Sequence, residues 1–281
     1  MNLALKPIKL KQKSVIPGFG ITMGFTLSYI TLLILIPISM VFINSAGIGF
    51  KRFWEIVSSE RVIASLKISF GTSFLAAVIN VFIGLLIAWV LERYTFSGKK
   101  VVDGLIDLPF ALPTAVAGIS LTTLYAQNGW IGRLFASMGI KISYTPLGIV
   151  VALVFISFPF VVRTVQPVLQ NIDLEVEEAA ACLGASRFQT FYKVILPELL
   201  PAMITGFSLA FSRALGEYGS VVFISGNMPL KTEITPLLIR AKLEQYDYVG
   251  GTAVAAIMLV ISFIMLFVIN FFEWRASNRY K

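Results

Sequence analysis

The sequence predicts an all-α polytopic membrane protein with six transmembrane helices. Of the 281 residues, 57% are hydrophobic and only 14% are charged, whereas soluble domains are about 45–50% apolar and about 25% charged. The mean hydropathy is +0.84. The apolar residues also gather in long uncharged runs, and a helix needs about 20 such residues to cross a bilayer.

The expected spans follow from these runs in chain order. Five of the runs carry no charge: Phe19–Ile43, Ile68–Leu91, Leu108–Ala126, Pro146–Val162 and Val249–Phe272. A further apolar run, Val194–Ser225, completes the set although it contains Glu198, Arg213 and Glu217. Phe19–Ile43 is too long for the apolar part of a signal peptide, which has about 7–15 residues. We therefore expect it to be a retained first helix.

The remaining segments define the domain organisation. We expect a cytoplasmic N-terminal segment at 1–18, one transmembrane domain at 19–272 and a cytoplasmic tail at 273–281. Most lysines and arginines then fall on the inner side, as the positive-inside rule requires, so both termini are placed in the cytoplasm. The same rule accounts for the net charge of +8 without a nucleic-acid partner. Short helices are expected in the amphipathic outer loops Asn44–Lys67 and Gly226–Tyr248.

Prolines interrupt several spans. We expect helix kinks at Pro109, Pro113 and Pro197, because proline lacks a backbone donor and clashes with the preceding turn. Carbonyls freed in this way within a membrane must face protein or water. Two interpretations stay open: ordinary packing kinks, or a bundle that bends around a pathway.

Missing residue types exclude most catalytic chemistry. The chain has no histidine and one cysteine, Cys182, so it has no Ser-His-Asp triad, internal disulfide or multi-cysteine metal site. We expect the Cys182 thiol to be buried, as free cysteines commonly are. No G-x-x-x-x-G-K-[ST] pattern is present, so the chain should not bind ATP through a P-loop. We therefore expect neither an enzyme nor a metal or cofactor site in this chain.

The inner loop 170–194 is the most informative segment. Asp173 suits a helix N-cap, and the acidic residues that follow favour the first turns of a helix. Ala179 to Ala181 provide a helical face of small side chains, and Gly184 permits a left-handed turn. A second short helix is expected from Arg187 to Val194. This surface suits insertion into another protein's groove, or packing on the end of its own bundle.

The loop resembles the EAA signature of ABC importer permeases. Glu178-Ala179-Ala180 is followed at the family spacing by Gly184 and by Val194-Ile195-Leu196-Pro197, where Val194 replaces the usual isoleucine. The resemblance implies a type I, MetI-like permease fold, in which this loop is a coupling helix that docks in a cleft of an ATPase subunit. The implied coupling residues are Glu177, Glu178, Ala179, Ala180, Gly184, Ala185 and Arg187.

Three further segments resemble the T subunit of bacterial sulfate/thiosulfate permeases. They are Asp107–Gly118, Phe160–Leu169 and Arg213–Gly219. The resemblance implies sulfate and thiosulfate import across the bacterial inner membrane by alternating access. Molybdate or tungstate permeases share much of the pattern and remain an alternative. A stand-alone secondary anion transporter would leave the Glu178–Pro197 signature unexplained.

The resemblance also implies partners. They are a W-type permease subunit in a heterodimer, two copies of an ATPase that binds ATP and Mg²⁺, and a periplasmic sulfate-binding protein. Molybdate systems instead pair two identical permease chains.

Arg213 and Glu217 are the candidates for an anion pathway. They lie four residues apart on one helix face, and ionisable residues within spans usually face the bundle interior. In one interpretation the two residues form a structural ion pair. In the other, Arg213 is a counter-charge for a dianion, and Glu217 weakens its attraction so that the anion is released. Ser208, Ser212 and Gly216 complete the expected path or gate.

The outer loop Gly226–Glu233 resembles the family's contact with the binding protein. The implied contact residues are Lys231, Thr232 and Glu233. A solvated loop without this role is the alternative.

Overall fold

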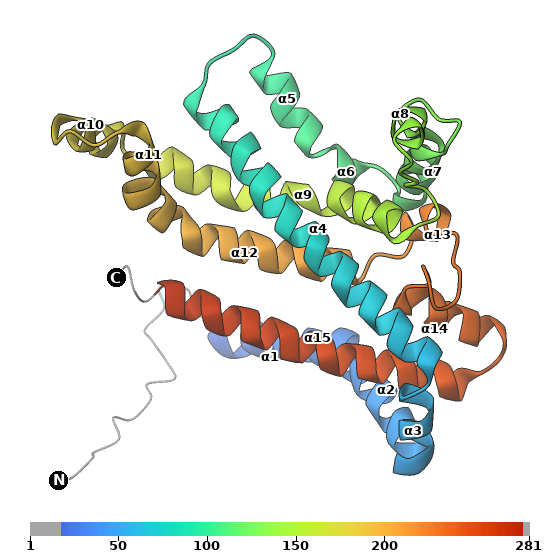
Figure 1. Ribbon diagram of the computed structural model, residues 1–281. Coiled ribbons are helices and arrows are strands. Elements are labelled where there is room, and N and C mark those ends of the chain that lie inside the picture. Colours follow the sequence, from blue (N-terminus) through green and yellow to red (C-terminus); the bar gives the residue numbers. More distant parts are fainter. Residues whose placement is uncertain (1–17, 278–281) are drawn as a thin grey trace.

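The computed structural model describes residues 18–277, whose regular structure is entirely helical (Figure 1). Within these residues, five helical segments are long and apolar enough to cross a membrane: Phe19–Gly47, Glu60–Arg93, Pro146–Asn171, Arg187–Leu215 and Tyr248–Arg275. Thr114–Tyr125 is a shorter apolar helix. The expected N-terminal segment up to residue 17, and the tail beyond residue 277, lie outside the described residues.

The first span lies at the edge of the bundle and packs against the last one. It comprises α1 (Phe19–Ile30), the π-helical turn η1 (Thr31–Leu35) and α2 (Ile36–Gly47), and α2 contacts α15 (Tyr248–Ser277). The wide turn precedes Pro37, whose missing N–H and bulky ring disturb the normal helical bonding.

The second span, α4 (Glu60–Arg93), is one unbroken helix. It begins before the expected Ile68 because a helix can continue through its charged first turns outside the apolar region. Glu60 in the first turn and Arg93 in the last turn suit the helix dipole. Its 34 residues extend for about 50 Å, which exceeds the thickness of a bilayer with its headgroups, about 40–45 Å.

The third expected span is not a continuous helix. Instead, α5 (Lys99–Ile106) leads into α6 (Leu108–Ala111), and α7 (Thr114–Tyr125) follows after a break. Leu112 is extended, with φ −82° and ψ 133°, because the residue before a proline avoids helical geometry. The expectation of one helix over Leu108–Ala126 is therefore wrong.

The fourth span, α9 (Pro146–Asn171), is the centre of the bundle. It packs along α4 and along α12 (Leu196–Leu215). Gly84 of α4 lies so close that an added Cβ would sit 2.7 Å from Val161 Cγ1. The helix continues past the expected end at Val162, and its inner half contributes Val165 and Leu169 to the main core.

The fifth span is interrupted at both ends. α11 (Arg187–Thr190) continues through the π-helical turn η2 (Phe191–Ile195) into α12. The expected short helix ending at Val194 is therefore the first part of a longer one, and its wide turn precedes Pro197. Helix α12 ends at Leu215 instead of Ser225, and the short α13 (Val221–Ile224) follows a link of five non-helical residues, 216–220.

Short helices also form in the outer loops, as predicted. They are α3 (Phe50–Val57) and α14 (Thr235–Glu244). The remaining short elements are α8 (Gly132–Ser137) and α10 (Leu174–Cys182). The thiol of Cys182 is exposed, so the expected burial is wrong: α10 projects from the end of the bundle and has no core of its own (Figure 1).

Candidate functional site

The inner loop forms a helix with a defined end. Asp173 occupies the N-cap position of α10, although its side chain makes no capping hydrogen bond. At the other end, Ala185 N–H donates to Ala180 O at 3.0 Å and Gly184 N–H donates to Ala181 O at 2.9 Å. These two bonds form a Schellman motif, which needs a left-handed residue. Gly184 supplies it with φ +84°.

The next helix begins with a capping box. Gln189 N–H donates to Ser186 Oγ at 3.3 Å, and Ser186 N–H donates to Gln189 Oε1 at 2.9 Å. The two caps fix the chain on either side of Ala185. Loop 170–194 is thus an ordered helix-turn-helix instead of a loose connection.

The outward face of this loop combines acidic, small and large apolar side chains. Of the predicted coupling residues, Glu178, Ala179, Gly184 and Arg187 are exposed, whereas Glu177, Ala180 and Ala185 are half-buried. Leu183 is 89% exposed and Phe188 is 75% exposed. These two side chains were missed in the sequence, although large apolar residues in a polar inner loop are a signal for docking.

Glu177 points toward the bundle and not toward solvent. Its Oε1 lies 2.5 Å from Nη2 of Arg93, the last residue of α4. The angles do not satisfy hydrogen-bond geometry, so the contact is an ion pair, and both atoms are shielded from solvent. The Arg93 guanidinium also lies 5.7 Å from the centre of the Trp89 ring.

Arg213 and Glu217 form the ion pair that the sequence suggested. Arg213 Nη1 lies 2.6 Å from Glu217 Oε2. The other carboxylate oxygen accepts from Ser220 N at 2.9 Å and from Ser220 Oγ at 3.0 Å. Glu217 is 2% exposed and Arg213 is one-third exposed. The carboxylate is therefore fully engaged, whereas the guanidinium is accessible.

The other expected pathway residues differ in their surroundings. The Ser208 hydroxyl is buried without a hydrogen-bond partner, and Ser212 Oγ donates to Ser208 O within α12. Gly216 is the exposed C-cap of that helix. Three residues further on, an added Cβ on Gly219 would sit 2.1 Å from Thr114 Oγ1, so a glycine is favoured where α7 meets the link between α12 and α13.

Two of the three residues expected to contact a partner are buried in the outer loop. Lys231 is exposed, but Thr232 and Glu233 are both 1% exposed. Thr232 Oγ1 accepts from Met228 N at 3.0 Å. Arg61 of α4 donates from Nε and Nη2 to the two oxygens of Glu233, each at 2.7 Å. Glu233 is thus an internal partner of α4 instead of a surface contact.

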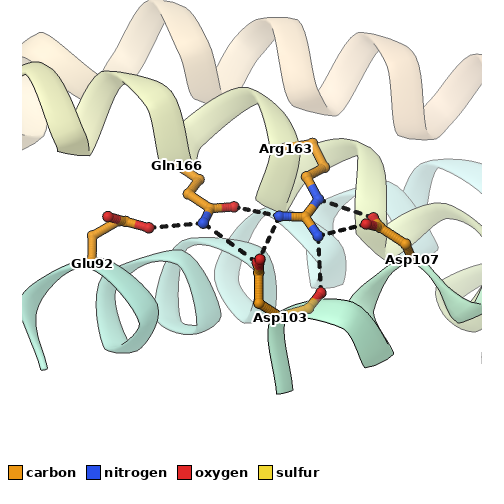
Figure 2. A network of polar contacts seen from close by, with 5 residues as sticks. All are labelled: Glu92, Asp103, Asp107, Arg163 and Gln166. Atoms are coloured by element: carbon orange, nitrogen blue, oxygen red, sulfur yellow. Dashed lines mark hydrogen bonds and ion pairs between the residues drawn. The ribbon is translucent and has the colours of Figure 1, made fainter. Parts of the chain in front are cut away.

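A polar network at the inner half of α9 was missed in the sequence (Figure 2). Arg163 makes five hydrogen bonds: to both oxygens of Asp107, to the side chain and backbone carbonyl of Asp103, and to Gln166. Gln166 in turn donates to Glu92 of α4 at 2.7 Å. The network joins α4, α5, α6 and α9 around one guanidinium.

Side chains that commonly bind metals do not cluster near these sites in the described part of the chain. Within residues 18–277, the structure contains no group of three or more histidine, cysteine, aspartate or glutamate side chains placed to hold a metal.

A family model and curated relatives match most of the chain. The sequence model of the family described as "Binding-protein-dependent transport system inner membrane component" matches residues 80–278. A sulfate transport system permease protein CysT from Escherichia coli is 45% identical, with 96% of this chain and 98% of that protein covered. A probable sulfate transport system permease protein from Chlorokybus atmophyticus is 51% identical over 88% of this chain and 87% of its own length.

Solved structures share the fold at low sequence identity. A bacterial alginate ABC transporter chain has a TM-score of 0.73 at 18% identity, covering 90% of this chain and 93% of its own. A chain of the MetNI methionine ABC transporter has a TM-score of 0.54 at 19% identity, covering 78% of this chain and 96% of its own. With its apolar spans, its ordered inner loop and the family match over most of its length, the chain belongs to the binding-protein-dependent transport system inner membrane components.

Proposed function

We propose that this chain is the membrane-spanning subunit of an ATP-driven importer that moves sulfate across the bacterial inner membrane. The observation that carries the proposal is the close similarity, over nearly the full chain, to proteins named as sulfate transport permeases. The same relatives favour sulfate over molybdate. Thiosulfate, another divalent sulfur oxyanion, is the second proposed cargo.

The energy for import comes from a separate ATPase in this proposal. The helix-turn-helix at 170–194 supplies an ordered surface with the exposed apolar side chains Leu183 and Phe188, which suits docking into a cleft of that subunit. ATP and Mg²⁺ are bound there and not by this chain. The proposed orientation places this loop, and both termini, in the cytoplasm.

The proposed assembly has three further kinds of subunit. This chain pairs with a W-type permease subunit in a heterodimer, two ATPase copies dock on the inner face, and a periplasmic sulfate-binding protein docks on the outer face. Lys231 is the one member of the expected outer contact set that is exposed for such docking. Alternating access between the two faces then admits the anion to one side at a time.

Arg213 is the proposed counter-charge on the anion path. A dianion cannot cross hydrocarbon without compensation, because burying an unpaired charge costs far more than any single contact returns. Glu217 is held by Ser220 as well as by Arg213, and the partly exposed Arg213 guanidinium is left to face the path. Arg213 must bind the anion weakly, because a tightly bound anion would not be released.

Uptake of labelled sulfate in the native cell, with and without this gene, tests the proposal. Labelled molybdate is measured in parallel, and the intact gene is restored as a control. We expect sulfate uptake to be lost and molybdate uptake to be unchanged. Loss of molybdate uptake alone would overturn the substrate assignment, and unchanged uptake of both anions would overturn the proposed function.

A further inference from the structure

Helix α10 has few packing contacts that would fix its position relative to the spans. It makes close backbone contacts chiefly with α11, and it contributes no buried residue to the core. A helix of nine residues is too short to be stable alone in water. Its position relative to the spans therefore depends on side-chain contacts.

The inner end of α4 supplies such contacts on both sides of the loop. Arg93 pairs with Glu177 of α10 at 2.5 Å, with both atoms shielded from solvent. One turn earlier, the Trp89 ring packs edge-on against Phe191 of η2, with ring centres 5.5 Å apart. Arg93 also rests on Trp89. The end of α4 thus contacts both α10, which precedes Gly184, and η2, which follows it.

The outer end of α4 likewise forms side-chain contacts with a neighbouring loop. Arg61 makes a two-pronged contact with the buried carboxylate of Glu233. Two turns further in, Ser69 Oγ accepts from Thr235 N at 2.7 Å and donates to Thr235 Oγ1 at 3.1 Å. The loop before α14 is therefore joined to α4 by charged and neutral hydrogen bonds.

We propose that α4 is a rigid strut that passes displacement of coupling helix α10 to the outer loop at Glu233, and that Arg93 is the positioning residue that fixes α10 to it. An unbroken helix tied by an arginine at each end carries a displacement along its length. Coupling between distant sites needs a contiguous physical element of this kind. The inference rests on the proposed import function and adds the residue pair that transmits it.

The test measures sulfate imported per ATP hydrolysed by the complete complex in proteoliposomes. Arg93→Met and Glu177→Gln should each lower this ratio between about 2-fold and about 30-fold, the range found for residues that carry coupling. Arg93→Lys, which keeps the charge, and the exchanged pair Arg93→Glu with Glu177→Arg should recover part of it. Glu244→Gln, in the exposed pair with Arg240, is the matched control and should leave the ratio unchanged.

A second readout does not depend on transport. The single cysteine, Cys182, lies at the end of α10 and is exposed, so a spin label attached there reports the mobility of that helix in the chain held in lipid nanodiscs. Arg93→Met and Glu177→Gln should raise the label's mobility, and the exchanged pair should lower it again.

The two readouts separate the two proposals. A wild-type complex that imports no sulfate overturns the proposed function, while the label still tests the attachment of α10. A wild-type complex that imports sulfate, with variants that keep either the ratio or the label mobility of the wild type, overturns the role of Arg93. If Arg93→Met fails to insert, Glu177→Gln alone tests the pair, with the same two readouts and the same contradicting outcomes.

Discussion

Helices α4 and α12 both pack along α9, yet they are built in opposite ways. Helix α4 runs for 34 residues without a proline and ends in arginines that hold other parts of the chain. Helix α12 begins after a π-helical turn, contains Pro201 and stops at Gly216. One is suited to moving as a unit and the other to bending. We propose that this difference separates transmission, assigned to α4, from gating, assigned to the broken end of α12 that carries Arg213 and Glu217.

The largest effect should come from loop 170–194, which contacts the end of α4 and continues into α12. Gly184→Trp should abolish ATPase association while membrane insertion is kept, because Gly184 has φ +84° and its turn shapes the docking surface. Gly98 also has a positive φ, +88°, and lies in a different inner loop, so Gly98→Trp is the matched control. Co-purification of the ATPase measures both. Normal association of the Gly184 variant would remove the docking assignment.

Arg213→Ala asks whether the end of α12 carries the anion chemistry. We expect uptake to fall about ten- to a hundredfold, since a charged hydrogen bond contributes about 1.5–3 kcal/mol. Assembly should be unchanged, because Glu217 keeps its two bonds from Ser220. Arg213→Lys retains the charge and serves as the control. Normal uptake by Arg213→Ala would make the pair purely structural.

Gly84→Leu tests whether α4 needs its close packing on α9. A Cβ at this position would lie 2.7 Å from Val161 Cγ1, so the larger side chain should lower the free energy of unfolding by about 1–3 kcal/mol. Gly71, on the same helix, has no atom within 4 Å of an added Cβ. Gly71→Leu should therefore leave thermal stability unchanged, and equal losses in the two variants would contradict the packing argument.

Pro197→Ala should make α12 more like α4. The new N–H at this position can bond to the Lys193 carbonyl and close the wide turn, which removes a proline cost of up to about 3 kcal/mol. We expect unchanged or higher thermal stability together with slower sulfate uptake. Faster uptake by the straightened variant would show that the bend is not needed for gating.

The smallest effect should come from the partly exposed ion pair between Lys242 and Asp247, which lies outside both helices. A hydrogen bond from Lys242, followed by one from Gly250 N–H, holds the pKa of Asp247 below its ordinary value. A lowered pKa stabilises the fold above the unfolded-state value, and this contribution disappears as the pH falls through the folded pKa. Because Asp247 is 44% exposed, Asp247→Asn should cost less than about 1 kcal/mol.

Thermal unfolding as a function of pH measures this contribution. The difference between wild type and Asp247→Asn should be constant near neutral pH and should vanish only below about pH 4. A difference that vanishes near neutral pH would assign the effect to another group.

The spans could be predicted because a bilayer demands long apolar runs, and α9 and α15 fulfil that demand directly. The sequence of loop 170–194 correctly predicted a helix followed by a left-handed turn at Gly184. The sequence also placed a kink at Pro113, and the structure has a full break there, with Leu112 extended because it precedes a proline. The apolar composition of Leu108–Ala126 nevertheless led to the prediction of one span.

Long-range partners could not be predicted. Arg163 meets Asp103 and Asp107 across a gap of more than fifty residues, and the i,i+4 spacing of the two aspartates was the one local sign. Glu233 resembled a surface residue until α4 was found to place Arg61 against it. Such pairs depend on how the helices are arranged, which apolar periodicity does not define.

The most direct test of the comparison is the length of each helix in two nucleotide states of the full complex. In a Cys182→Ser background, spin-label pairs replace the exposed residues Ile63 and Val90 on α4, or Tyr192 and Leu209 along η2 and α12. We predict an α4 distance of about 40 Å that is the same with and without ATP, and an α12 distance that changes. A change within α4, or no change within α12, would contradict the assignment of transmission to one helix and gating to the other.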